Sequence, residues 1–239
     1  MERRFFLSAM PAVVALELAE RERGVAPAQA PKTGCKPLRP PARGPIDVAF
    51  LVSEGATVID FTGPWEVFQD VNLPEREGAA FRLFTVAASR EPVRVTGGLQ
   101  IVPDYAVADA PAPRVVVVPA MRRSPAVVDW LKKTSVTADL VMSVCTGAFV
   151  LGHAGLLAGK KATTHHEFHD QLKAQFPDVT LERSARFVES ASNVATAGGL
   201  TSGIDLALHV VERYFGRDVA QRTATYMEYQ GKGWLTQTA

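Results

Sequence analysis

The sequence predicts an open, doubly wound α/β fold, in which helices cover both faces of a mostly parallel sheet. From Ile46 onward, short apolar runs alternate with longer amphipathic segments, which is the pattern of βαβ units. Two of the short runs, 114–119 and 139–144, are rich in apolar residues, as in strands that are covered on both faces. The chain has 239 residues, enough for one large core, so we expect a single domain over residues 46–239.

The expected elements of the first half begin with a buried strand, IDVAFLV, at 46–52. A helix is expected from Gly63, because Pro64 suits the first turn of a helix, where its missing N–H is not needed. Strands follow at 81–87, 114–119 and 139–144, with a helix over 124–133 between the last two.

Helical spacing dominates the second half. Apolar residues recur every three or four positions from Ile204 to Phe215, which predicts a helix over 201–215. Further helices are expected at 146–158, 167–176 and 218–229, and short extended segments at 162–164, 186–190 and 193–197.

The first 45 residues differ from the rest of the chain. Arg3 and Arg4 precede an apolar run that continues to Leu16, a length typical of a signal peptide and too short for a membrane span. This segment resembles a twin-arginine export signal, so residues 1–30 are expected to direct the protein to the periplasm. The charged stretch after Leu16 is atypical of such signals, and without export the protein would be cytoplasmic. Residues 31–45 are rich in proline, which is typical of an extended linker.

Charge and cysteine content exclude several classes of protein. The 26 basic and 25 acidic residues leave a net charge of +1, with no long basic run to follow a phosphate backbone, so no nucleic-acid partner is expected. The two cysteines, Cys35 in the linker and Cys145, are too few for a disulfide framework, and neither lies in a zinc-binding spacing. We therefore expect no bound metal and no membrane span.

Ligands of doubly wound sheets bind outside the carboxyl ends of the strands, and Cys145 lies at such a position. It follows the strand at 139–144 and precedes the helix expected near Thr146. Ser143 and Gly147 are small, as in a sharp strand-to-helix turn that presents a nucleophile. Because exposed N–H groups at a helix start favour an anion, the turn is expected to stabilise the Cys145 thiolate. The alternative is a small buried hydrophobe that ends a strand.

Three separated segments carry a family resemblance. They are VIDFTGPWEVF at 58–68, MSVCTGAFVLGHAGLLAGKKATTHH at 142–166 and NVATAGGLTSGIDLALHVVERYFG at 193–216. In this order they resemble the ThiJ/PfpI superfamily of class I glutamine amidotransferase-like proteins, and within it the isonitrile hydratase branch, over residues 46–229. The resemblance implies a flavodoxin-like three-layer α/β/α sandwich with a nucleophile elbow, a homodimer, and a reaction on a small molecule that needs no cofactor.

The resemblance also implies roles for three residues. Cys145 corresponds to the nucleophile, and Thr146 to the residue beside it whose backbone N–H and hydroxyl face the reacting group. Asp60, in the loop expected after the first strand, is similar to an aspartate that serves as acid and base in isonitrile hydratases. Burial and nearby negative charge would push the Asp60 carboxyl toward its protonated form, a proton donor near neutral pH. Asp60 could instead cap the helix that begins near Pro64.

His165 occupies the histidine position of the superfamily's TTH strand end, where it could orient or deprotonate the sulfur. The neighbouring HHEFHD sequence nearly forms an H-E-x-x-H metal motif, but Asp170 stands where the second histidine would have to be. His165 and His169 share one possible helix face without a third ligand, so we expect a solvated helix start there rather than a metal site.

The loop after the strand at 114–119 departs from the family pattern. The superfamily usually has two glycines there, whose backbone N–H groups help to form an oxyanion or intermediate pocket, and this chain has Ala120 and Met121. Because these residues do not adopt positive φ without strain, either the loop is remodelled or the substrate differs. Arg122 and Arg123 follow, and they either meet an anionic group or belong to a solvated loop.

Residues and resemblance together predict a cysteine-dependent hydratase, a lyase that converts an isonitrile to an N-substituted formamide. Two alternatives stay open. A glyoxalase- or deglycase-like enzyme would use the same sulfur against reactive aldehydes. A non-catalytic small-molecule sensor is the other, since similar domains form the amino-terminal half of AraC-type regulators. Those regulators continue into a helix-turn-helix region, whereas this sequence stops about ten residues past its last expected helix, so transcriptional control by this chain alone is not expected.

Overall fold

The structure is a computed structural model that describes residues 37–190 and 193–235. The predicted export signal at 1–30 and residues 31–36 of the predicted linker lie outside the described residues. Within the described ranges, no helix is both long enough and apolar enough to cross a membrane.

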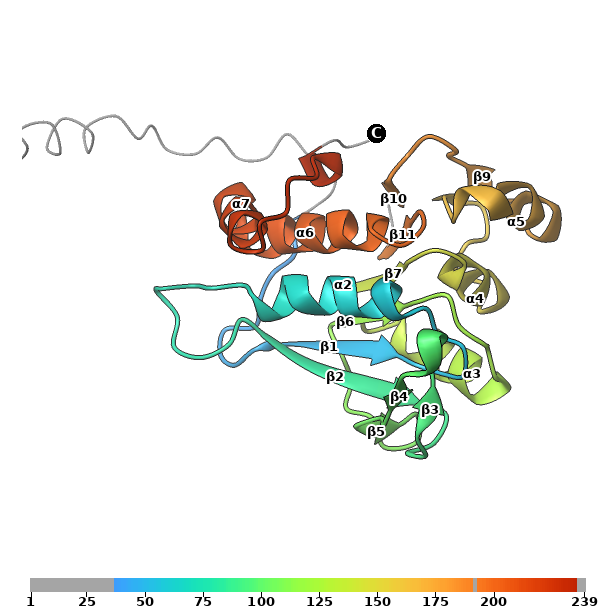
Figure 1. Ribbon diagram of the computed structural model, residues 1–239, viewed down its shortest axis with the longest axis horizontal. Helices are drawn as coiled ribbons and strands as arrows, with labels where there is room; N and C mark the ends of the chain where they lie inside the picture. The colour runs from blue at the N-terminus through green and yellow to red at the C-terminus, as the bar shows by residue number, and fades with distance from the viewer. Residues whose placement is uncertain (1–36, 191–192, 236–239) are drawn as a thin grey trace, which may run out of the picture. The chain divides into compact units, whose positions relative to one another are not determined.

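A seven-stranded sheet forms the centre of the described domain (Figure 1). Its strand order is β10-β11-β7-β6-β1-β2-β5, and every neighbouring pair is parallel except β10 with β11. The strands are β1 (Ile46–Leu51), β2 (Phe81–Ala87), β5 (Tyr105–Ala106), β6 (Val115–Val118), β7 (Leu140–Ser143), β10 (Phe187–Glu189) and β11 (Val194–Ala197). Two small pairs lie outside this sheet, β3 (Val93–Arg94) with β4 (Gln100–Ile101), and β8 (Lys161–Ala162) with β9 (Thr180–Leu181). The mostly parallel order confirms the predicted doubly wound fold.

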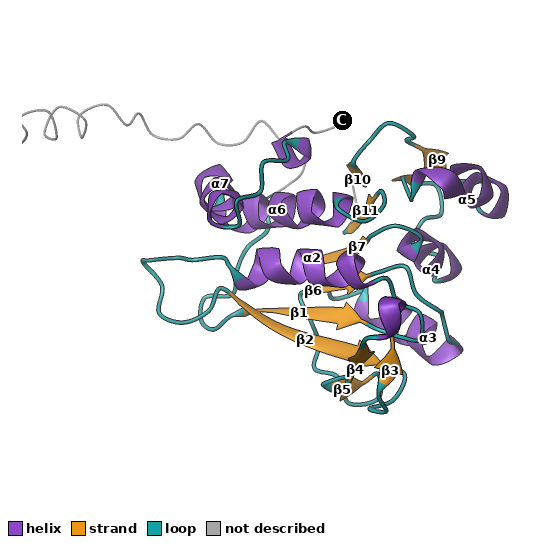
Figure 2. Ribbon diagram, in the orientation of Figure 1, coloured by secondary structure: helices purple, strands orange, loops and turns teal. Residues whose placement is uncertain are grey.

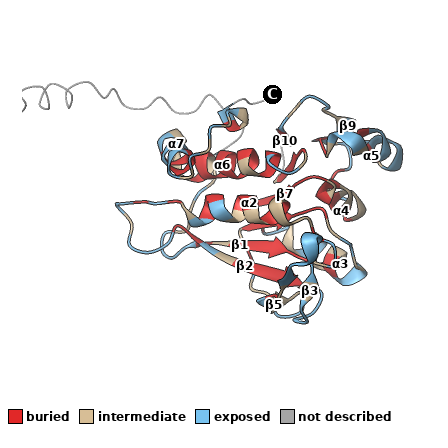
Figure 3. Cartoon of the chain, viewed as in Figure 1, coloured by how far each residue is buried: buried red, intermediate tan, exposed pale blue. Residues whose placement is uncertain are grey.

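Helices cover both faces of the sheet, as Figure 2 shows, which confirms the predicted three-layer α/β/α sandwich. In β1, Val48 and Phe50 belong to the core shared with one helical layer, whereas Ala49 and Leu51 belong to the core shared with the other. Both faces of the central strands are therefore buried (Figure 3), which explains their apolar sequences. The first layer contains α2 (Val58–Gln69), α6 (Ser202–Phe215) and α7 (Arg217–Tyr226); the second contains α3 (Pro125–Thr134), α4 (Gly147–His153) and α5 (His169–Gln175).

Two helix boundaries differ from the prediction by five residues. Helix α2 begins at Val58, ahead of the expected Gly63, so Asp60 lies in its first turn and Pro64 in its interior. The proline lacks the N–H that would bond to the Asp60 carbonyl, so packing of the helix on the core has to compensate for that lost bond. Helix α4 ends at His153 rather than at residue 158, because the chain turns at Gly155, whose φ is +75°.

Parallel register brings several strand ends to one edge of the sheet. Ser143 at the end of β7 pairs with Val118 of β6 and with Thr196 of β11, and β6 in turn pairs with β1. The loops that leave these four strands therefore converge, and they contain the residues that the sequence singled out.

Candidate active site

Cys145 lies at a strained turn between β7 and α4. Its φ is +58°, a left-handed conformation that costs a non-glycine residue about 1–2 kcal/mol and that clusters at functional sites. Hydrogen bonds hold the turn on both sides. The Cys145 N–H donates to the Gly198 carbonyl at 2.8 Å, and the Thr164 hydroxyl donates to the Cys145 carbonyl at 2.8 Å. The turn thus has the shape of the predicted nucleophile elbow.

Gly147 allows the elbow to approach the end of β6. A Cβ at this position would lie 2.2 Å from the Val118 carbonyl oxygen and 2.8 Å from that of Pro119. The Val118 carbonyl also accepts a hydrogen bond from the Val144 N–H at 3.0 Å, which holds it in place. Close backbone packing therefore requires a glycine at position 147.

The Asp60 carboxyl is completely buried beside the elbow. Its Oδ2 accepts a hydrogen bond from the Ala120 N–H at 3.1 Å, whereas Oδ1 has no aligned donor among the described residues. Burial raises the pKa of Asp60 from 3.8 to about 6, and interactions with the N–H groups of Ala120 and Leu200 and with the Cys145 thiol partly offset that rise. A raised pKa of Asp60 agrees with the prediction from the sequence. At pH 7.5, however, the carboxyl is mostly ionised, so it is ready to accept a proton before it donates one.

The prediction that the turn holds Cys145 as a thiolate is wrong for the free protein. The side chain is buried, and burial followed by the negative charge of Asp60 raises the pKa of Cys145 from 9.0 to about 11. The N–H groups of Thr146 and Leu200 and the Thr146 hydroxyl act in the opposite direction, but they do not outweigh burial. Near neutral pH the pair therefore carries one proton on the sulfur, next to an ionised carboxylate.

Leu200 supplies a backbone contact that the sequence analysis did not identify. Its N–H interacts with both the Asp60 carboxyl and the Cys145 thiol. Its φ is +54°, so a second non-glycine residue is held in the left-handed region at this site. The available signal was the concentration of small residues around it, with Gly198 and Gly199 directly before it.

The loop after β6 does not depend on glycine. Neither Ala120 nor Met121 has a positive φ. The Ala120 carbonyl accepts a hydrogen bond from the Thr57 N–H at 2.9 Å, and the Ala120 N–H donates to Asp60. In this loop the Ala120 N–H is therefore used to hold the Asp60 carboxyl.

His165 lies near the elbow, but its side chain is engaged elsewhere. Its Nδ1 accepts a hydrogen bond from the Glu167 N–H at 3.3 Å, and its ring packs at a tilt of 36° against His166, with the ring centres 4.5 Å apart. The ring also packs so closely on Gly199 that a Cβ there would lie 2.2 Å from it. Among the described residues, His165 is not one of the groups that shift the pKa of Cys145, and its predicted role stays a prediction.

His169 is buried, which corrects the expectation of a solvated helix start. Its Nε2 lies 3.1 Å from the Thr164 carbonyl, and burial lowers its pKa. Because the Thr164 hydroxyl donates to the Cys145 carbonyl, His169 helps to hold the elbow through Thr164. In the part of the chain that the structure describes, no three or more His, Cys, Asp or Glu side chains are grouped to hold a metal ion.

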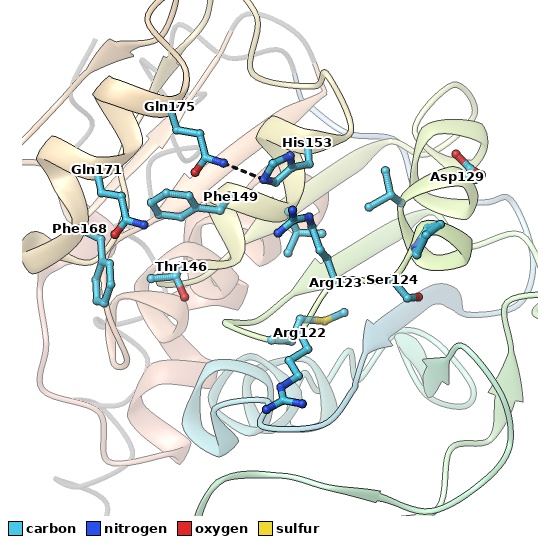
Figure 4. Close-up of a pocket in the computed structure, with 14 residues that line it drawn as sticks. Arg122, Arg123, Ser124, Asp129, Thr146, Phe149, His153, Phe168, Gln171 and Gln175 are labelled. Atoms are coloured by element: carbon cyan, nitrogen blue, oxygen red, sulfur yellow. Dashed lines mark hydrogen bonds between the residues drawn. The ribbon is translucent and has the colours of Figure 1, made fainter.

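An open pocket of about 990 Å³ adjoins the elbow (Figure 4). Thr146 connects the two, because it interacts with the Cys145 thiol and also lines the pocket. Phe149 and Phe168 line the pocket from the side of α4 and α5. The loop before α3 lines it with Met121, Arg122, Arg123 and Ser124.

The DJ-1/PfpI family model matches residues 47–213 of this chain. The chain belongs to the DJ-1/PfpI family. Isonitrile hydratase from Pseudomonas putida is 33% identical over 190 residues, which cover 77% of this chain and 78% of that protein. A solved structure, that of a ThiJ/PfpI family protein from Pseudomonas syringae, aligns with a TM-score of 0.70 and 28% identity over 86% of this chain and 84% of that one.

Other proteins to which this chain is similar are transcriptional regulators. The HTH-type transcriptional regulator GbdR of Pseudomonas aeruginosa is 29% identical over 197 residues, which cover 80% of this chain but 53% of the regulator. Membership therefore agrees with the predicted fold and resemblance, and the activity has to be argued from the site.

Proposed function

We propose that this protein is an isonitrile hydratase-like lyase, which adds water to the terminal carbon of an isonitrile and releases an N-substituted formamide. The observation that supports this most is the buried pair formed by the Cys145 thiol and the Asp60 carboxylate, which holds one proton near neutral pH. The similarity to isonitrile hydratase over 77% of this chain supports the same reaction.

The first step forms a carbon–sulfur bond. As the sulfur attacks the isonitrile carbon, Asp60 takes the thiol proton and passes it to the same carbon, giving the thioimidate R–N=CH–S–Cys. An isonitrile carbon accepts both a nucleophile and a proton, so one carboxylate can serve as base and then as acid. The N–H groups of Thr146 and Leu200 stabilise the negative charge that develops on the sulfur.

The second step releases the product. Water adds to the thioimidate carbon while Asp60 takes a proton from it and delivers that proton to nitrogen, giving R–NH–CH(OH)–S–Cys. The carbon–sulfur bond then breaks, the hydroxyl proton returns through Asp60 to the sulfur, and R–NH–CHO leaves. In sum, one isonitrile and one water give one N-substituted formamide, and no oxidant or reductant is consumed.

Incubation with cyclohexyl isocyanide is expected to yield N-cyclohexylformamide, detected by mass spectrometry. Cys145→Ala should lower the rate to the uncatalysed background, because no other group replaces the nucleophile, and its thermal unfolding should show that it still folds. A parallel incubation with methylglyoxal tests the glyoxalase-like alternative, for which lactate is the product. Equal formamide yields from the two proteins would contradict the hydratase proposal.

The pH dependence of the rate tests which group of the Asp60–Cys145 pair holds the proton. We expect kcat/KM to rise with pH through an apparent pKa near 6 and then to stay level up to about pH 9. Below pH 6 the Asp60 carboxyl is mostly protonated and cannot take the thiol proton. The thiol itself stays mostly protonated until about pH 11. With Cys145→Ala as the blank at each pH, a profile that is flat from pH 5 to 8 would contradict Asp60 as the base.

A non-catalytic sensor is the second candidate. It is favoured by the un-ionised thiol and by the Ala120 N–H, which is already bonded to Asp60. Binding of cyclohexyl isocyanide without turnover, measured by calorimetry, would support the sensor.

A further inference from the structure

The pocket beside the elbow is larger than a small isonitrile requires. Its volume of about 990 Å³ lies at the upper end of the range for pockets that hold drug-sized ligands. A compound such as cyclohexyl isocyanide would fill only a fraction of it. The rest of the pocket is lined by charged and aromatic side chains, which bear on the identity of the substrate.

Two arginines dominate the charge of this pocket. Arg122 and Arg123 are exposed, both line the pocket, and within the described residues neither guanidinium has a hydrogen bond or an ion pair. Their backbone is anchored on both sides, because the Ser53 hydroxyl donates to the Arg122 carbonyl at 2.7 Å and Ser124 caps α3. Other arginines of the domain pair with carboxylates, as Arg82, Arg90, Arg114, Arg183 and Arg186 do.

The other titratable groups of the pocket leave this positive charge uncompensated. Asp129 of α3 lines the pocket, but in Figure 4 it lies apart from both guanidinium groups. His153 is bonded to Gln175, and burial together with the charge of Arg123 lowers its pKa, so it is neutral at pH 7. In Figure 4 the Arg123 side chain extends toward His153, whereas that of Arg122 extends to the other side of the loop. An anion beside His153 would therefore meet the Arg123 guanidinium without a competing carboxylate.

We propose that the natural substrate carries a carboxylate at the end remote from its reacting carbon, that Arg123 binds this group, and that Arg122 adds positive charge to the same pocket. Guanidinium groups recognise carboxylates through paired, charge-assisted hydrogen bonds. The apolar part of the substrate lies against Phe149 and Phe168, while Thr146 marks the end next to the sulfur. This inference rests on the proposed function, since it assigns the substrate class of the same site.

The first test compares substrates that differ only in this charge. ω-Isocyano carboxylates of increasing chain length are assayed beside their methyl esters. At one chain length or more, the wild-type protein is expected to show a kcat/KM for the acid at least tenfold above that for the ester. In the double variant R122Q/R123Q this ratio should fall about tenfold, while R222Q, which removes an exposed arginine of α7, should keep the wild-type ratio. Equal values for acids and esters at every length in the wild-type protein would overturn the inference.

The second test does not depend on turnover. Cys145 is alkylated with iodoacetate and with iodoacetamide, and modification of its peptide is followed by mass spectrometry, which separates it from Cys35. The rate constant for the anionic iodoacetate, divided by that for the neutral iodoacetamide, should fall several-fold in R122Q/R123Q and stay unchanged in R222Q. If no isonitrile is hydrated and the ratio still falls, the proposed function fails and the anion pocket stands. If acids and esters are hydrated equally and the ratio does not change, the pocket assignment fails alone.

Discussion

Asp60→Asn is expected to slow isonitrile hydration strongly and, at pH 8, to make the protein more stable than the wild type. Asparagine cannot take the thiol proton, which should lower the rate by about 10²–10⁴-fold. Its side-chain oxygen can still accept the hydrogen bond from the Ala120 N–H, so the local structure is preserved.

The gain in stability follows from the direction of the pKa shift. In the unfolded chain the carboxyl ionises at its ordinary value of 3.8, but in the folded protein only at about 6. Between these two values the folded state binds the extra proton, so its stability falls as the pH rises. The penalty is absent below pH 3.8 and complete above about pH 6, where it can reach about 3 kcal/mol. Asparagine has no charge to bury and avoids this penalty.

Urea unfolding at pH 8 and at pH 4.5 measures the effect. The difference between Asp60→Asn and the wild type should be large at pH 8 and smaller at pH 4.5. Asp109→Asn is the control, because Asp109 is exposed and Arg90 lowers its pKa, which reverses the sign. A lower stability of Asp60→Asn at pH 8 would show that the buried carboxylate is not penalised.

Gly147→Ala is expected to disrupt the elbow and to destabilise the fold by about 3 kcal/mol or more. The added methyl group would lie 2.2 Å from the Val118 carbonyl oxygen, which is bonded to the Val144 N–H and cannot move without breaking the contact between β6 and β7. Cys145 would move with the turn, so activity should be lost together with stability. Denaturant unfolding and the formamide assay measure the two effects.

Gly155→Ala is the matched control for that variant. Gly155 has a φ of +75° but no atom within 4 Å of an added Cβ, so the substitution adds backbone strain without a clash. It should cost only about 1–2 kcal/mol and leave the elbow in place. If Gly147→Ala cost no more than this control, close packing at the elbow would not be the reason for the glycine.

The strands were predictable because burial on both faces leaves a strong mark on sequence. β2 occupies 81–87 as expected, and β6 and β7 lie within their apolar runs. The position of Cys145 followed from the same signal, since a strand end and small neighbours define a sharp turn. Predictions of this kind depend on local sequence and succeed where local preferences and tertiary packing agree.

The predictions that were wrong concern features that depend on tertiary packing. Pro64 suggested a helix start, but α2 continues across it, with Phe61 and Phe68 on either side buried in the core. The proton on Cys145 depends on how completely the surrounding elements exclude water, and no local pattern encodes that. Leu200 was missed because a leucine with positive φ has no sequence signature of its own.

The protonated state of the buried Cys145 sulfur also governs how it meets oxidants. With a pKa of about 11, only a very small fraction of the sulfur is ionised at pH 7. Peroxides react with the ionised form, so sulfenic acid should accumulate slowly at this position. The cysteine should therefore stay reduced between encounters with substrate. In the proposed reaction its nucleophilic form arises when the neighbouring Asp60 carboxylate takes the thiol proton.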